Sequence, residues 1–373
     1  MTMPRSSYVK EGEEGVYHCI SRCVRRAFLC GIDKITGRDL SHRKAWLLER
    51  LKFLASVFSI DVCAYAIMEN HYHLVIRTRP DLLDDLSNEE IATRWLRLCR
   101  RRELSSRCHW PSEKEISLLA VQGDRILELR RRLSSISWFM AMVNEHIARW
   151  SNKEDGVKGR FWEGRFKCQV LLDEAAIAAC MVYVDLNPIR AGIAETPEGS
   201  GFTSIRERIR GWQKRRLKSK GSDVNEGTER ITPSRGLPSM MKRWESLFST
   251  DDIGLRYEAN DFEWLCPVES SVDRRGILDL SDTEYFELVD QSGRMVRSDK
   301  IGSIDSDLVP LLMRIGANRD RWRETITSFG SSYSLAGGVL VNLRDFAARL
   351  GRRWLKGTTA AEGAFLKIPQ EAL

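Results

Sequence analysis

Residues 61–78, DVCAYAIMENHYHLVIRT, decide the fold of this chain. Two short apolar runs rich in β-branched residues, 61–68 and 71–78, stand on either side of Glu69 and Asn70. A polar, turn-like pair between two such runs is typical of a tight connection between antiparallel strands. The segment therefore predicts a β-hairpin.

The hairpin lies within a longer alternation of strands and helices. Residues 17–24 alternate and are β-prone, whereas 44–58 carry apolar residues at helical spacing, so the chain begins as strand, helix, strand, strand. Residues 88–133 form an Arg-rich region of helical periodicity, and 137–150 predict a better amphipathic helix. This order favours an α+β fold, an antiparallel sheet with flanking helices, over a doubly wound parallel sheet.

A further helix is predicted late in the same region. The short run 165–172 leads to Asp173, which is a suitable N-cap for a helix that continues through Leu186. Pro188 then ends that helix, because proline lacks the backbone N–H that would continue it.

The composition changes after residue 210. Residues 211–238 are polar and rich in Lys, Ser, Gly, Thr and Pro, which predicts a flexible linker. We therefore expect one domain over 1–210, the linker, and a C-terminal region over 239–373. That last region has enough apolar residues to fold, but its sequence indicates no function.

The overall composition is that of a soluble globular protein. Of the 373 residues, 42% are hydrophobic and 30% are charged, and no apolar run approaches the roughly 20 residues that a membrane span needs. The first 15 residues lack the apolar core of a secretory signal. The net charge of +7 is a mild excess that is compatible with a nucleic-acid partner.

The nine cysteines are odd in number and scattered, which favours reduced thiols and a cytoplasmic location. Cys19, Cys23 and Cys30 stand close to His18, but their spacing fits no compact zinc motif.

His71 and His73 are the first candidates for chemistry. Residues two apart in a strand project from the same face, so both imidazoles can reach one cation from a rigid platform. Neutral histidine binds first-row divalent ions well and leaves coordination positions open. A pair of strand histidines that merely form hydrogen bonds is the alternative.

Tyr183 and Asn187 form a second candidate pair. They are four residues apart and share one helical face, so Tyr183 can offer a nucleophile and Asn187 a third metal ligand. A phenol is a weak acid, and a nearby cation would help its attack on phosphate. The alternative is a buried tyrosine followed by an asparagine cap.

The segment before the last predicted strand mixes cations with aromatic residues. Arg160, Arg165 and Lys167 stand around Trp162, a combination suited to holding phosphates while stacking unpaired bases. The alternative is a loop whose aromatic rings fill the edge of the core.

Four segments, in this order along the chain, resemble the single-tyrosine HUH transposases and, within them, the REP-associated branch. HUH denotes histidine, hydrophobic residue, histidine. The segments are 17–22 (YHCISR), 68–75 (MENHYHLV), 159–167 (GRFWEGRFK) and 183–192 (YVDLNPIRAG).

The resemblance implies a ferredoxin-like HUH core that binds and cleaves single-stranded or hairpin DNA. His71, His73 and Asn187 would bind Mg²⁺ or Mn²⁺, and Tyr183 would form a 5′-phosphotyrosine intermediate before the strands are rejoined. Arg190, in the motif that follows Tyr183, would join the DNA contacts. The expected location is cytoplasmic and nucleoid-associated, and both a monomer and a homodimer remain open.

Three features depart from the compact family pattern: the long region 88–133, the extension beyond Gly211, and Tyr72 between the two histidines. None removes a catalytic residue, but they leave the DNA target open. Two other functions stay in consideration. One is a domesticated protein that binds DNA hairpins without cleaving them, and the other is an HUH relaxase or replication initiator.

Overall fold

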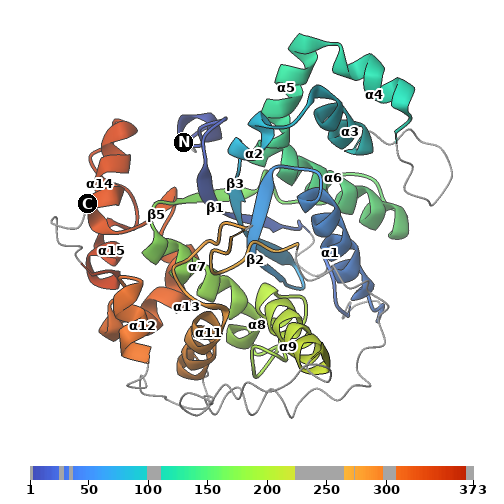
Figure 1. Ribbon diagram of the computed structural model, residues 1–373. Coiled ribbons are helices and arrows are strands. Elements are labelled where there is room, and N and C mark those ends of the chain that lie inside the picture. Colours follow the sequence, from blue (N-terminus) through green and yellow to red (C-terminus); the bar gives the residue numbers. More distant parts are fainter. Residues whose placement is uncertain are drawn as a thin grey trace.

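The computed structural model describes residues 3–24, 29–32, 37–98, 111–222, 264–272, 274–296 and 308–366. At its centre is a five-stranded sheet in the order β2-β3-β1-β4-β5, with helices on both faces (Figure 1). The strands are β1 (Gly15–Arg22), β2 (Ile60–Ile67), β3 (His71–Thr78), β4 (Lys167–Leu171) and β5 (Ala336–Gly337).

The hairpin predicted for residues 61–78 is confirmed. β2 and β3 pair antiparallel, with Ile67 opposite Tyr72 next to the turn. β1 pairs antiparallel with β3 on one side and with β4 on the other, whereas the short edge strand β5 runs parallel to β4. Because side chains alternate along a strand, the central strands have two distinct faces.

Two helices, α1 (His42–Ala55) and α6 (Ile136–Glu154), cover one face of the sheet. The chain order β1, α1, β2, β3, α6, β4 and the sheet order β4-β1-β3-β2 give a ferredoxin-like core and confirm the expected α+β class. Tyr72 points into this layer, where its hydroxyl donates a hydrogen bond of 2.7 Å to Asn144 of α6. The tyrosine between the two histidines therefore faces away from them.

Helix α7 (Glu174–Asp185) covers the opposite face. Its predicted N-cap is confirmed, because the Asp173 side chain accepts a hydrogen bond from the backbone of Ala176. Every residue from 175 to 185 is buried, and a helix that is apolar all round must be covered on all sides. The sheet covers one side, and helices α11 (Asp282–Val296) and α13 (Trp322–Ser332) cover the other.

The C-terminal region is therefore built into the same core as the sheet. One continuous cluster of buried residues includes β-strand, α7, α11 and α13 side chains, and β5 adds a strand from this region to the sheet. The Asp185 carboxylate at the end of α7 joins the layers further. It accepts hydrogen bonds from Ser204, from the backbone of Ile205 and from the hydroxyl of Tyr285.

The linker predicted for 211–238 is wrong in its first part. Helix α9 spans Ser204–Ser222, and residues 223–238 lie outside the described residues. Trp212 holds the helix against α11, with its ring 6.3 Å from that of Phe286 and perpendicular to it. The polar composition was misleading because Lys and Arg are good helix formers, and α9 is docked by Trp212 together with an ion pair of 2.8 Å between Arg215 and Asp282 of α11.

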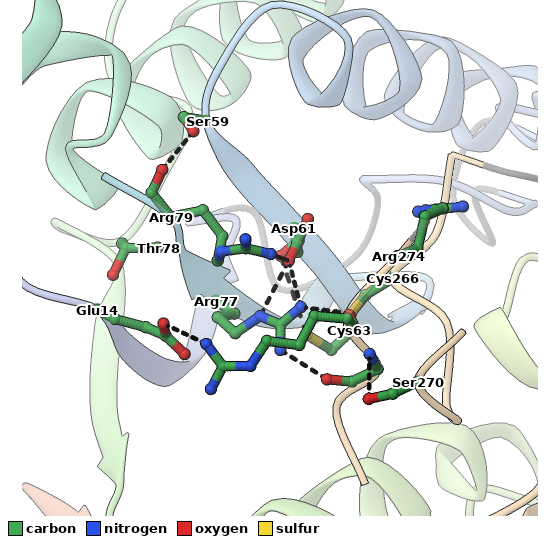
Figure 2. Close-up of polar contacts among 12 residues, drawn as sticks. Glu14, Ser59, Asp61, Cys63, Arg77, Thr78, Arg79, Cys266, Ser270 and Arg274 are labelled. Atoms are coloured by element: carbon green, nitrogen blue, oxygen red, sulfur yellow. Dashed lines mark hydrogen bonds and ion pairs between the residues drawn. The ribbon is translucent and has the colours of Figure 1, made fainter. Parts of the chain in front are cut away.

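Arg77 of β3 fixes the segment around Cys266 to strands β2 and β3 (Figure 2). Its buried guanidinium pairs with Asp61 at 2.6 Å and donates to the backbone carbonyls of Arg275 and Gly276. It also approaches the sulfur of Cys266 at 3.3 Å. A buried charge that is fully hydrogen-bonded specifies one position for this segment.

The region 88–133 is helical where it is described, through α3, α4 and α5, and residues 99–110 lie outside the described residues. Figure 1 shows these helices at the opposite end of the molecule from the C-terminal helices. The remaining elements are η1 (Arg5–Ser7), α2 (Asp81–Asp84), α3 (Asn88–Leu98), α4 (Glu113–Ala120), α5 (Gly123–Leu133), α8 (Asn187–Arg190), α12 (Leu308–Arg314), η4 (Arg319–Arg321), α14 (Leu340–Arg349) and α15 (Thr358–Ala364).

Two bulk properties can be read from the described residues. None of their helices has the length and apolar character to cross a membrane. The described cysteines are all buried.

Candidate active site

His71 and His73 lie on the face of β3 that α7 covers. Their ring centroids are 4.9 Å apart, as the alternation of a strand predicts. His73 is buried and His71 is partly exposed, so the pair lies where the core opens to solvent.

A chain of hydrogen bonds fixes the orientation of His73. The Gln169 amide donates to the carbonyl of Tyr333 at 2.6 Å, and its oxygen lies 2.8 Å from Nδ1 of His18. Nε2 of His18 in turn lies 2.9 Å from Nδ1 of His73. With the Gln169 oxygen as acceptor, Nδ1 of His18 carries the proton, and Nδ1 of His73 donates to His18. This tautomer leaves the lone pair on Nε2 of His73 free for a cation.

His71 is held in the same way by a different partner. Its Nδ1 lies 2.6 Å from the side-chain oxygen of Asn70, in the turn between β2 and β3. Nε2 of His71 is therefore also left as an acceptor. Metal-bound histidines usually commit their second nitrogen to such a hydrogen bond, which fixes the tautomer and the ring plane.

All three imidazoles are neutral at neutral pH. Burial lowers the pKa of His18 to about 4, and burial, aided by Arg22 and Arg190, lowers the pKa of His71 to about 4. The pKa of His73 lies well below its ordinary value, first because of burial and then because of the neighbouring histidines. A neutral imidazole is the form that binds a metal ion.

Tyr183 of α7 points at this cluster. Its ring meets that of His73 edge-on at 5.6 Å and that of His18 at 5.9 Å. The side chain is 8% exposed, and within the described part of the chain no group hydrogen-bonds to its hydroxyl. Tyr183 therefore lies against His73 of the predicted pair, and these side chains come from one chain.

Two helices hold the phenol in place. On one side, the Arg190 guanidinium of α8 lies over the ring, 4.3 Å from its centroid. On the other side, α13 passes so close that a Cβ on Gly330 would lie 2.6 Å from the hydroxyl oxygen. Nη1 of Arg190 is buried and has no hydrogen-bond partner among the described residues. A buried guanidinium nitrogen without a partner can donate to an external acceptor, and a phosphate oxygen would be a suitable one.

Asn187 begins α8, one turn after Tyr183. It is 7% exposed, its Nδ2 is buried without a partner among the described residues, and no hydrogen bond joins it to either histidine. A buried amide with an unused group fits a site that is completed by an external ligand. No cluster of three or more His, Cys, Asp or Glu side chains within the described residues could hold a metal ion.

The predicted DNA contacts divide into two groups. Arg165 and Lys167 are exposed and form no ion pair with any described residue. Arg160 is exposed, but its guanidinium is bound to the backbone carbonyls of Trp162 and Glu163. It therefore stabilises its own loop.

Trp162 cannot stack on a base as predicted. It is only 9% exposed, its indole N–H donates to the carbonyl of Asn144, and its ring meets that of Tyr72 edge-on. The alternative interpretation of this loop, aromatic rings that fill the edge of the core, is the correct one for Trp162. Its aromatic character carried no information about which way it points.

Sequence reasoning missed His18 and Gln169 as members of the site. The signal for His18 was its position in a predicted strand. In that strand His18 shares a face with Ile20, and Ile20 lies opposite His73 in the neighbouring strand. The register between β1 and β3, which brings His18 to His73, depends on pairing between distant segments and could not be predicted from the sequence. Gln169 had no signal, because its role depends on a carbonyl from the C-terminal region.

Comparison with known proteins gives one solved structure. No family model matches the chain, and no curated protein matches it. The chain is similar to the structure of a REP-associated tyrosine transposase bound to a REP hairpin, over 64% of this chain and 100% of that chain. The sequence identity is 12% and the TM-score is 0.32.

Proposed function

We propose that this protein is a transposase-type enzyme that nicks and rejoins single-stranded or hairpin DNA through Tyr183. One observation carries the proposal: the Tyr183 ring packs edge-on against His73, beside two imidazoles with free Nε2 atoms, and its hydroxyl has no hydrogen-bond partner among the described residues. The unpartnered Arg190 beside it supports a phosphate as the substrate group. The four motifs that resemble the HUH transposases support the same reaction.

In the proposed reaction, the Tyr183 oxygen attacks a phosphorus atom of the DNA backbone. A new bond forms between this oxygen and phosphorus, and the bond between phosphorus and the 3′ oxygen breaks. The phenol proton passes to solvent, and the released 3′ oxygen takes up a proton. One phosphodiester replaces another, so the 5′-phosphotyrosine link keeps the energy needed for rejoining, and no nucleotide cofactor is required.

His71, His73 and Asn187 would hold a divalent cation, Mg²⁺ or Mn²⁺, beside the scissile phosphate. Such an ion, when bound, supplies positive charge that polarises the phosphate and stabilises the developing negative charge. Imidazole ligands suit Mn²⁺ better than Mg²⁺, so the proposal favours Mn²⁺ at low metal concentration.

The remaining side chains orient the reactants. His18 and Gln169 hold His73 in the tautomer that presents Nε2, and Arg190 would neutralise a phosphate oxygen next to the Tyr183 ring. Because the hydroxyl lies against α13, it has little freedom to turn away from the phosphate. This kind of positioning accounts for a large share of the rate in phosphoryl transfer.

The test is a covalent adduct between the protein and DNA. Purified full-length protein is incubated with end-labelled DNA hairpins that carry single-stranded flanks of many sequences, with Mn²⁺, Mg²⁺ or a chelator, and run on a denaturing gel. A labelled band at the size of protein plus DNA that needs both metal and Tyr183 is expected, and Tyr183→Phe abolishes it.

Tyr72→Phe is the matched control. This tyrosine stands between the two histidines in sequence, yet its hydroxyl points to Asn144 on the other face of the sheet. The control therefore keeps the adduct. Hairpin binding by the native chain without an adduct on any flank would replace the proposal with the domesticated binding protein.

A further inference from the structure

A cleft of about 930 Å³ opens beside the candidate active site. One wall is β4 with the residues before it, and the other is the loop between α14 and α15 in the C-terminal region. Two of its lining residues also touch the site: Gly330 packs on the Tyr183 hydroxyl, and Gln169 holds His18. A chain that lies in this cleft would therefore end at the reacting tyrosine.

The cleft is strongly basic. Arg165 and Lys167 stand on one wall and Arg352, Arg353 and Lys356 on the other, and no carboxylate of the described residues lines the space between them. All five are exposed, and none has an ion pair with any described residue. Five cations without ion pairs around one cleft give it a positive potential, which attracts a polyanion such as the phosphate backbone of a nucleic acid.

Aromatic groups accompany these cations. Trp354, between Arg353 and Leu355, is 70% exposed, which is unusual for so large an apolar side chain. Tyr333 is 3% exposed and lines the same cleft, and its buried hydroxyl has no partner among the described residues. An exposed indole offers a stacking surface, and an unused hydroxyl can donate to a phosphate or a base.

The loop that carries these groups is held by its ends. Helix α14 terminates in a Schellman motif, in which Arg352 N–H bonds to the carbonyl of Ala347 and Gly351 N–H to that of Ala348, both at 2.9 Å. Gly351 adopts φ +65°, a left-handed conformation that suits glycine. Leu355 is buried and anchors the other end of the loop. The cations and the indole are thus presented from a fixed position.

We propose that this cleft binds the single-stranded DNA segment that adjoins the cleaved phosphate, and that the C-terminal region supplies half of its wall. The proposal rests on the proposed function. A single strand is favoured over a duplex because only unpaired bases expose the faces that Trp354 can stack on. The cations would follow the phosphates from the surface to Tyr183.

The test measures binding apart from chemistry. All variants carry Tyr183→Phe, and their affinity is measured by fluorescence anisotropy for two hairpins, one with a single-stranded flank and one without it. Arg352→Ala with Arg353→Ala is expected to weaken binding of the flanked hairpin at least 10-fold. It should also reduce the slope of log affinity against log salt by about 1.4, the value for two lost contacts to a single strand. The blunt hairpin should bind as before.

A control of equal charge comes from the neighbouring helix. Arg344→Ala with Arg349→Ala removes two exposed arginines of α14 that do not line the cleft, and it should leave both affinities within 2-fold of the parent. Trp354→Ala alone should weaken the flanked hairpin roughly 5- to 100-fold by loss of stacking, with little change in the salt slope.

The outcomes separate the two proposals. Equal affinity of the parent protein for flanked and blunt hairpins overturns the cleft assignment, as does an equal loss in the cleft and control pairs. If the native chain forms no adduct but the cleft variants lose affinity only for the flanked hairpin, the cleft assignment stands and the proposed nicking activity is overturned. If the native chain forms the adduct but the variant with Arg352→Ala and Arg353→Ala binds both hairpins normally, the nicking activity stands and the cleft assignment is overturned.

Discussion

Gly330→Ala tests whether α13 seats the reactive tyrosine. The added methyl carbon would lie 2.6 Å from the Tyr183 hydroxyl oxygen and 3.0 Å from its Cζ. Ordinary contact begins near 3.4 Å, so the hydroxyl has to withdraw by roughly 0.8 Å. Alanine gains about 1 kcal/mol over glycine inside a helix, whereas overpacking costs about 1–3 kcal/mol, so the net loss of stability is about 0–2 kcal/mol.

The effect on activity should exceed the effect on stability. A displacement near 1 Å of a reacting group can cost about 100-fold in rate, so adduct formation should slow by roughly 10- to 100-fold. The assay is single-turnover adduct formation with excess protein, together with thermal unfolding of the same samples. The mutant is assayed at a temperature at which both proteins remain folded.

Gly293→Ala is the matched control for this experiment. It also lies in a C-terminal helix, α11, but its added carbon would approach a methyl group of Leu186 at 3.2 Å, which a small side-chain shift can relieve. This variant should form the adduct at the native rate. If Gly330→Ala reacts within 2-fold of the native protein, then the hydroxyl is not confined by α13 and the reasoning is refuted.

Three further predictions concern the groups that hold the site together. Asp185→Ala leaves the backbone N–H of Ile205 and the hydroxyl of Tyr285 without an acceptor, whereas Ser204 keeps a contact with the carbonyl of Tyr65, and the change should cost about 2–6 kcal/mol in urea unfolding; a loss below 1 kcal/mol would contradict the role of this carboxylate. Gln169→Leu frees the tautomer of His18 and should weaken Mn²⁺ binding, measured by calorimetry, about 10- to 100-fold; unchanged affinity would show that the hydrogen-bond chain does not tune the ligand. A hydrogen bond from Arg314 is the main cause that lowers the pKa of Glu284 from 4.5 to about 2. The pair therefore contributes fully to the free energy of unfolding above pH 4.5, and this contribution is lost as the pH falls toward 2. After discount for solvent screening, this contribution is about 1 kcal/mol or less. Glu284→Gln should therefore show a weaker pH dependence of unfolding in that window, and an identical profile would count against the pair.

The buried helix α7 explains why the C-terminal region cannot be treated as a separate appendage. The sequence from Glu174 to Asp185 has no polar face, and this property is contained in the order of its residues alone. A sheet can cover only one side of such a helix, so a second cover was required. Its identity, α11 and α13, follows from packing between segments that are far apart in the sequence and has no local signature.

The sequence by itself determined the strands, the hairpin and the chemistry that short spacings impose. His71 and His73 share a face because side chains alternate along a strand, and this local rule holds in the structure. Tyr183 and Asn187 were expected on one face of a single helix, but α7 ends at Asp185 and Asn187 begins the separate helix α8. The direction in which Trp162 points and the continuation of α9 past residue 210 are not local, because burial depends on which distant surface arrives there.

Only the tertiary structure decided how the site is assembled. His18 reaches His73 because β1 pairs with β3 in one particular register, and Gln169 reaches His18 because β4 pairs with the other edge of β1. The carbonyl of Tyr333 and the wall formed by Gly330 come from a region that the sequence left without a function. Residue spacing fixes which groups a segment presents, but the free energy of packing the whole chain fixes which groups meet.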